Sequence, residues 1–257
     1  MGRGLAGKAL AAAAATVLLL AAADASAVKL QFGDFVLVAD GSFRPSKLPE
    51  RRDAPIVLRG NAKISTRSQK LPPNLRRLVV EYDRHASVQT AGLPVCRASR
   101  LASTTVPAAR RRCGRTIVGN GMAHAAIEFA SGQRIPVSSP ITLFNGPRTR
   151  GFPTVLAHAY TTVPIRTTFV VPIVIEKIRR GEFGYRTRID VPTIAGGAGT
   201  LIAGRLKIGR RWTHRGRRHS FVNARCEVGH LQVRGEFTFT DGTYVKGGLV
   251  KSCGVRH

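Results

Sequence analysis

Short runs of apolar or alternating residues recur along the chain from about Phe32 onward, and glycine, proline, aspartate or asparagine separates each run from the next. No long segment has the 3.6-residue period of an amphipathic helix. The runs predict strands around residues 35–38, 56–58, 78–82, 116–118, 125–129, 141–144, 154–160, 167–174, 183–189, 200–208, 219–228, 231–239 and 243–250. The pattern predicts an all-β antiparallel β-sandwich of the jelly-roll type, although a β-barrel or two smaller sandwiches also fit it.

Turn signals add detail to this series of strands. Asp241-Gly242 lies between two alternating runs and predicts a hairpin with a type I′ turn, which requires positive φ at both central residues. The glycine-rich stretch 195–199 predicts a flexible loop rather than a phosphate site, because no helix and no Gly-Lys-Ser/Thr ending follows it. Residues 28–257 are expected to form a single domain, with a candidate seam near 145–151, where the strand pattern is interrupted.

Residues 1–27 have the features of a secretory signal peptide. Arg3 and Lys8 give a positive start, residues 10–23 an apolar core, and Ala25-Ser26-Ala27 a small-residue cleavage motif. The apolar stretch of about fourteen residues is shorter than the roughly 20 that span a bilayer. We therefore expect a secreted, extracellular protein that begins at Val28, has no transmembrane anchor and could associate with the cell wall.

The charge balance is strongly positive. The chain has 41 Lys and Arg against 14 Asp and Glu, a formal net charge of +27, or +26 once the predicted signal peptide is removed. Such a field favours polyanions, among them wall polymers, anionic lipid head groups and nucleic acid. Arginine outnumbers lysine, and alanine, glycine and valine are plentiful, which is also the composition that a GC-rich genome produces. The charge therefore has both a functional and a compositional explanation.

Four cysteines form an even set in a chain that is expected to be exported, which predicts two disulfides with three connectivities open. We favour the two local pairs, Cys96 with Cys113 and Cys226 with Cys253. The first would close an arginine-rich segment, 97–112, that has little regular pattern, and the second would tie the last strands together. There is no Cys-x-x-Cys spacing and the seven histidines are dispersed, so we expect neither a metal nor a cofactor.

The segment 210–219 is the leading candidate for a binding surface. Its candidate binding residues are Arg210, Arg211, Trp212, Arg215, Arg217 and Arg218. Guanidinium groups bind phosphate and carboxylate bidentately, and an exposed indole can stack on a sugar or a base. The alternative is a solvated hairpin tip with the tryptophan folded back onto the sandwich. The arginines of segment 97–112 form a second candidate, which would reinforce the first if both lay at one end of the fold.

Catalytic signals are weak by comparison. Glu81 and Asp83 alternate along a predicted strand and share one face, as the two carboxylates of a glycosidase or a cation site would. A solvated face neutralised by Arg76, Arg77 and Arg84 is the simpler interpretation. No Gly-x-Ser-x-Gly motif is present and no free thiol is expected. The sequence assigns no catalytic residue and favours a protein that is not an enzyme.

Several short motifs carry a resemblance to known sequences. They are Leu71-Pro72-Pro73, Gly92-Leu93-Pro94-Val95-Cys96, Cys113 with Val118-Gly119-Asn120-Gly121, Leu143-Phe144-Asn145-Gly146, Val191-Pro192 with Gly196-Gly197, and Ala224-Arg225-Cys226. Through them the chain resembles an uncharacterised group of secreted proteins from high-GC actinobacteria, over nearly the whole mature length. The resemblance implies an exported, disulfide-bonded, β-rich protein and implies no activity.

Together these features predict an exported, non-catalytic binding or structural protein that associates with an anionic cell-wall polymer or another polyanion. A wall-glycan hydrolase is one alternative, and it would require a cleft with convergent carboxylates. A protein–protein interaction module is another, and an exposed apolar patch would be its mark.

Overall fold

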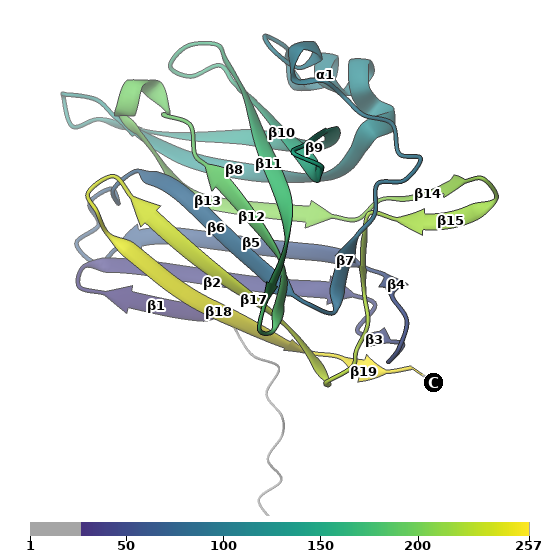
Figure 1. The fold of residues 1–257 in the computed structure, drawn as a ribbon. Helices are drawn as coiled ribbons and strands as arrows, with labels where there is room; N and C mark the ends of the chain where they lie inside the picture. Colours follow the sequence, from purple (N-terminus) through teal and green to yellow (C-terminus); the bar gives the residue numbers. More distant parts are fainter. Residues whose placement is uncertain (1–26, 257) are drawn as a thin grey trace, which may run out of the picture.

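In the computed structural model, residues 27–256 are described, and most of their regular structure is antiparallel β-sheet (Figure 1). The predicted all-β antiparallel class is therefore confirmed. The predicted signal peptide, apart from its last residue, lies outside the described residues. Over the described range, no helix combines the length and the hydropathy needed to cross a membrane.

One sheet of 12 strands forms the body of the molecule, and every neighbouring pair in it is antiparallel. In the order of pairing, its strands are β1 (Val28–Phe32), β2 (Phe35–Arg44), β5 (Val57–Thr66), β13 (Gly199–Ile208), β8 (Ile117–Glu128), β9 (Arg134–Thr149), β10 (Phe152–Thr161), β11 (Thr167–Arg180), β12 (Phe183–Asp190), β6 (Leu75–Asp83), β17 (His230–Phe239) and β18 (Tyr244–Ser252). Strands β8 to β12 follow one another as a meander, whereas the other strands join segments that are distant in the chain.

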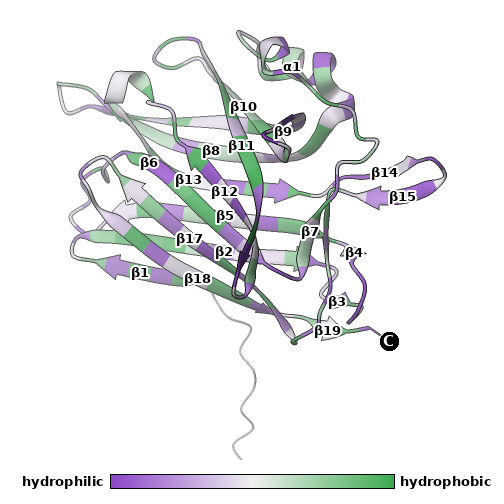
Figure 2. Ribbon diagram, viewed as in Figure 1, coloured by the Kyte–Doolittle hydropathy of each residue, from purple (hydrophilic) through white to green (hydrophobic). Residues whose placement is uncertain are grey.

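The sheet curls until its first and last strands meet (Figure 1). Leu30 of β1 packs so closely against β18 that a Cβ added to Gly247 would lie 2.5 Å from its Cδ1 atom. The sandwich is thus formed by one nearly closed sheet rather than by two separate sheets. Apolar and polar residues alternate along its strands, so one face lines the interior and the other faces water (Figure 2).

Several small elements lie at the edges of the large sheet. They are the hairpin of β14 (Arg211–His214) and β15 (Arg217–Ser220), the sheet of β4 (Ala54–Pro55), β16 (Val222–Ala224) and β7 (Ala86–Val88), the parallel pair β3 (Lys47–Leu48) and β19 (Gly254–Val255), helix α1 (Val106–Cys113), and three 3₁₀ turns at Ala98–Arg100, Gly114–Thr116 and Ala195–Gly197.

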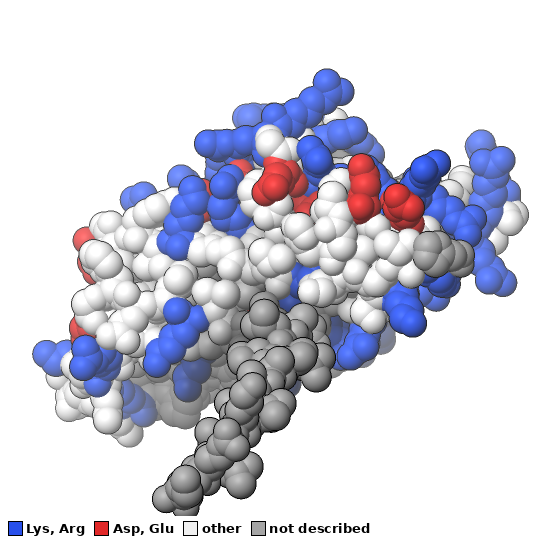
Figure 3. All heavy atoms as spheres, turned by 90° about the horizontal axis from the view of Figure 1, so that it is seen from below, with Lys and Arg blue, Asp and Glu red and all other residues white. Residues whose placement is uncertain are grey.

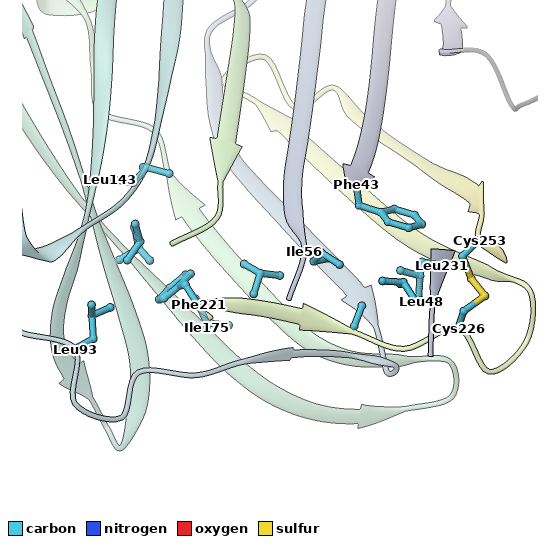
Figure 4. Packing of buried hydrophobic residues seen from close by; sticks show 14 residues of the cluster. Phe43, Leu48, Ile56, Leu93, Leu143, Ile175, Phe221, Cys226, Leu231 and Cys253 are labelled. Carbon is cyan, nitrogen blue, oxygen red and sulfur yellow. A yellow bond between two sulfur atoms is a disulfide. The ribbon is translucent and has the colours of Figure 1, made fainter. Parts of the chain in front are cut away.

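Buried side chains form clusters at both ends of the interior. One cluster packs β2 and β5 against β6, β17 and β18, and includes Phe35 and Phe239, whose rings meet edge to face at 4.7 Å. The larger cluster surrounds Phe221, which is 1% exposed, and reaches the Cys226–Cys253 disulfide (Figure 4). This disulfide therefore closes the end of the core from which the C-terminal segment leaves.

Both predicted disulfides are formed. The segment that Cys96 and Cys113 enclose, expected to have little regular pattern, instead contains α1 and a 3₁₀ turn. Cys96, Leu101 and Ala109 are fully buried against the outer side of β9 and β10. The helix was missed because only Ala109 and Cys113 of its eight residues are buried, which leaves no apolar period to detect.

One turn differs from expectation, and the segment named as a candidate seam lies within the large sheet. At Asp241-Gly242 only Gly242 has positive φ (87°), and the amide of Phe239 donates to Thr243 at 2.9 Å. The connection is therefore a three-residue loop with a left-handed glycine, and the type I′ prediction is wrong. Residues 145–151 form the end of β9 and its two-residue turn into β10, within the same sheet.

Candidate functional site

A basic groove lies where the hairpin β14–β15 leaves the large sheet. It has a volume of about 670 Å³, and the residues that line it are Pro45, Lys47, Ala54, Pro55, Arg211, Trp212, Thr213, Arg218, His219 and Arg256. One wall comes from the hairpin and the other from the segments before β3 and around β4, with the C-terminal segment beside them. The groove thus joins parts of the chain that lie far apart in sequence.

Four permanent positive charges face this groove: Lys47, Arg211, Arg218 and Arg256. All four side chains are exposed, and none forms an ion pair with a carboxylate within residues 27–256. Lys and Arg side chains gather at the edge of the molecule from which the hairpin projects (Figure 3). The groove is consequently a site of concentrated, uncompensated positive charge.

An aromatic face anchors the hairpin to the body of the protein. Trp212 pairs with His219 across the two strands, and their rings stack with centroids 5.6 Å apart. The indole Nε1 donates to the carbonyl of Ala91 at 3.0 Å. His214, on the same face, packs so closely on Gly92 that a Cβ there would lie 2.1 Å from its ring. The indole is therefore engaged with the protein, as the folded-back alternative predicts.

The opposite face of the hairpin supplies its arginines to the groove, which the edge of the aromatic face also borders. Because side chains alternate along a strand, Arg211 and Thr213 lie on the face that Trp212 does not occupy, and Arg218 is directly opposite Thr213. Arg215 (φ 49°) and Gly216 (φ 71°) form the two-residue tip, with the paired positive φ values of a type I′ turn. The anchored face fixes the direction in which the arginines of the other face project.

The structure brings together half of the candidate residues in segment 210–219. Those that line the groove are Arg211, Trp212 and Arg218. Arg210 turns the other way, and its Nη1 donates to the carbonyl of Ile117 at 3.3 Å. Arg215 and Arg217 lie at the tip of the hairpin, outside the lining of the groove.

Sequence reasoning missed Lys47 and Arg256. Both come from short segments toward the two ends of the described residues, and the parallel pairing of β3 with β19 brings them to the same site. The amide of Arg256 donates to the carbonyl of Leu48 at 2.8 Å, which holds the C-terminal segment in place. No local sequence pattern predicts such a pairing, because both strands have only two residues.

The arginines of segment 97–112 do not enter the groove. Helix α1 packs over β9 and β10, and Arg112 Nη1 donates to the carbonyl of Arg100 at 3.3 Å within the same segment. Only the stretch that leads into this segment, through Gly92, contacts the hairpin. The second candidate is thus a separate basic surface.

The carboxylate of Glu81 is buried rather than solvated, contrary to the simpler interpretation of its strand. It is 2% exposed and lies between Arg186 of β12 and Arg234 of β17, which face it across both neighbouring strands. Arg186 donates to Oε1 at 2.6 and 3.0 Å, and Arg234 donates to Oε2 through two nitrogens. Burial alone would raise the pKa of Glu81, but the two arginines outweigh it and hold the pKa below its ordinary value.

Asp83 is buried as well and is bound separately. Its Oδ1 accepts the amide of His85 at 2.8 Å and lies 2.9 Å from the ring nitrogen Nδ1, and its Oδ2 accepts the amide of Gln232 at 3.1 Å. Neither carboxylate lines the groove. The pair therefore serves the packing of three strands, and its arrangement is not that of two carboxylates flanking a bound substrate.

No family model, curated protein or solved structure matches the chain. The class of protein is accordingly defined by its own features. It is an all-β protein with two disulfides, one nearly closed antiparallel sheet and a basic groove at the base of a projecting hairpin.

Proposed function

We propose that this is an exported, non-catalytic protein that binds an anionic polymer of the cell envelope in the basic groove beside hairpin β14–β15. The observation that carries the proposal is the set of four exposed cations in one groove without a carboxylate partner in the described chain. Like charges held together repel each other, and a bound polyanion would replace that repulsion with charge-assisted hydrogen bonds. The predicted signal peptide and the two disulfides support an extracellular site of action.

The geometry of the hairpin supports a preformed site. Its aromatic face is fixed by the stack of Trp212 on His219 and by the hydrogen bond to Ala91, so the arginines of the other face need little ordering when a ligand binds. A binding role that depends on this surface differs from one that depends on net charge alone. The functional and the compositional explanations of the positive charge can therefore be distinguished by comparing arginines that line the groove with arginines that do not.

The test is binding of the oxidised mature protein to isolated cell walls and to soluble poly(glycerol phosphate), with variants R211Q/R218Q and R215Q/R217Q. Both variants lose the same charge from the same hairpin, but only the first loses it from the groove. We expect R211Q/R218Q to weaken binding by about tenfold or more, and R215Q/R217Q by less than about threefold. Equal losses would mean that only the net charge matters, and the proposal would then be wrong.

A further inference from the structure

A second hollow lies on the outer face of the large sheet, over β2, β5, β13 and β8. It has a volume of about 530 Å³, and the residues that line it are Ser42, Arg59, Gly60, Asn61, Asn120, Gly121, Arg205, Leu206 and Lys207. We refer to it as the outer hollow. Arg59, Arg205 and Lys207 are exposed and have no carboxylate partner among residues 27–256.

Strand register places these cations in rows. Arg59 of β5 pairs with Lys207 of β13, and Asn61 pairs with Arg205 two residues along. Side chains alternate along a strand, so Leu206, between the two cations, packs against the core cluster, although it also borders the hollow. The outer hollow is therefore a regular array on one sheet face rather than a chance meeting of long side chains.

The same strands lead from the outer hollow directly to the basic groove. Positions 205, 207, 209 and 211 follow each other at alternate residues from β13 into β14, and the two strands run on in the same direction (Figure 1). The position between the two sites is Gly209, which lies against Val57 so closely that a Cβ there would be 2.8 Å from the Cγ2 atom of Val57. No side chain of residue 209 separates the hollow from the groove.

We infer that the outer hollow and the basic groove form one continuous basic track that binds a single extended polyanion. This inference rests on the proposed function and names the kind of polymer. Arg205, Lys207 and Arg211 are spaced by even numbers of residues, so at roughly 3.3 Å per residue the successive cations lie about 7 Å and about 13 Å apart and the stretch from 205 to 211 spans about 20 Å. The track fits a flexible linear chain that carries one phosphate per short repeat, such as a polyol phosphate.

The chemistry of the track favours a polymer recognised through its charges alone. The chain has one tryptophan, and its indole is held against His219 and Ala91. Asp40, the acidic residue in the row of Arg205, is engaged by Lys251 at 2.9 Å. Because the indole that borders the groove is already stacked on His219 and hydrogen-bonded to Ala91, the bases of a single-stranded nucleic acid would gain little stacking energy here.

The experiment compares an octamer and a dimer of glycerol phosphate in binding to the full mature protein across a salt series. The variants are R205Q/K207Q in the outer hollow, R211Q/R218Q in the groove, and R179Q/R180Q as a matched control at the exposed end of β11. We expect each track variant to weaken octamer binding by about tenfold and to lower the salt slope by about one to two, with little change in the control. The dimer occupies one hollow at a time, so its affinity should change by less than about threefold.

The outcomes separate this inference from the proposed function. If R211Q/R218Q weakens octamer binding but R205Q/K207Q behaves like the control, the groove binds polyanions and the continuous track is wrong. If neither variant differs from the control, both the track and the proposed function are wrong. Binding of an oligothymidylate of equal charge more tightly than the octamer would also overturn the track, because it would require stacking that the surface does not provide.

Discussion

Glu81 is a buried charge whose role is set by its two cross-strand arginines. Replacing it with glutamine leaves Arg186 and Arg234 without their shared carboxylate, in a site that is nearly closed to water. We expect E81Q to lower the free energy of unfolding by about 3 kcal/mol, measured by urea denaturation at pH 7. E236Q removes a carboxylate whose partner, Lys246, is largely exposed, and should change the stability by less than about 1 kcal/mol.

The same carboxylate predicts a response to acid. Its folded-state pKa is depressed, so the stability it contributes is present above the unfolded pKa of about 4.3 and is lost as the pH falls through the folded value. The stability difference between the wild type and E81Q should therefore shrink below about pH 4. A difference that stays constant down to pH 2 would contradict this account of Glu81.

His158 predicts a second response, at milder pH. The ring is fully buried, its Nε2 lies 3.0 Å from the carbonyl of Thr104, and its Nδ1 has no partner in the described chain. Burial lowers the pKa of His158, so the unfolded chain takes up a proton first and stability falls as the pH drops below about 6.5. The slope attributable to this residue is at most about 1.4 kcal/mol per pH unit, and H158N should lack it. Equal slopes in the two proteins between pH 5 and 7 would refute the assignment.

At the scale of elements, the tip of hairpin β14–β15 holds an arginine in a conformation that favours glycine and asparagine. Arg215 has φ 49° and lies outside the groove. We expect R215N to raise the free energy of unfolding by about 0.5 kcal/mol, because asparagine tolerates the left-handed region better. Polyanion affinity should stay within about twofold of the wild type. A loss of stability in thermal and urea unfolding would show that the arginine makes a contact that outweighs its strain.

The two disulfides stabilise different elements and should differ in their effect on binding. Cys226–Cys253 holds the segment that carries Arg256 into the groove, whereas Cys96–Cys113 closes the segment around α1. Serine replacement of either pair should lower stability by about 2–4 kcal/mol. Only C226S/C253S should also weaken polyanion binding, which calorimetric titration at low temperature can measure on the folded fraction. Equal binding by the two variants would exclude a role for the C-terminal segment in the groove.

Sequence reasoning succeeded where a structural rule is local. Period-two alternation located most strands of the large sheet, although it missed β1 and divided β8 into two. The even number of cysteines in a chain expected to be exported indicated two disulfides, for which the two local pairs were favoured. It failed where a residue's main contacts come from distant parts of the sequence, and where a strand consists mostly of polar and charged residues. The arginines that bury Glu81 lie 105 and 153 residues away from it, and β14 and β15 are so polar that they were read as a loop or hairpin tip. The groove was half identified for the same reason, since Lys47 and Arg256 reach it only through tertiary pairing.

For the whole molecule, the excess of positive charge should make stability depend on salt. A formal charge of +27 over the full chain implies net self-repulsion in the compact state, which salt screens over a Debye length of about 10 Å at 0.1 M. We therefore expect the Tm to rise between about 20 and 300 mM NaCl at pH 7. Sodium sulfate at equal ionic strength controls for specific anion binding. A falling Tm would mean that attractive pairs, such as those around Glu81, dominate the electrostatics.

The seam between β1 and β18 has a consequence for how this chain reaches its fold. Leu30 and Gly247 lie near opposite ends of the described residues, so the sheet cannot close until β18 has been synthesised. Pairings such as β5 with β13 and β6 with β17 also bridge long stretches of sequence. Proteins with many such non-local contacts fold slowly, because the chain loses the entropy of closing long loops before the stabilising contacts form. The chain therefore passes through an interval in which it is complete but still open, with the facing edges of β1 and β18 not yet in contact.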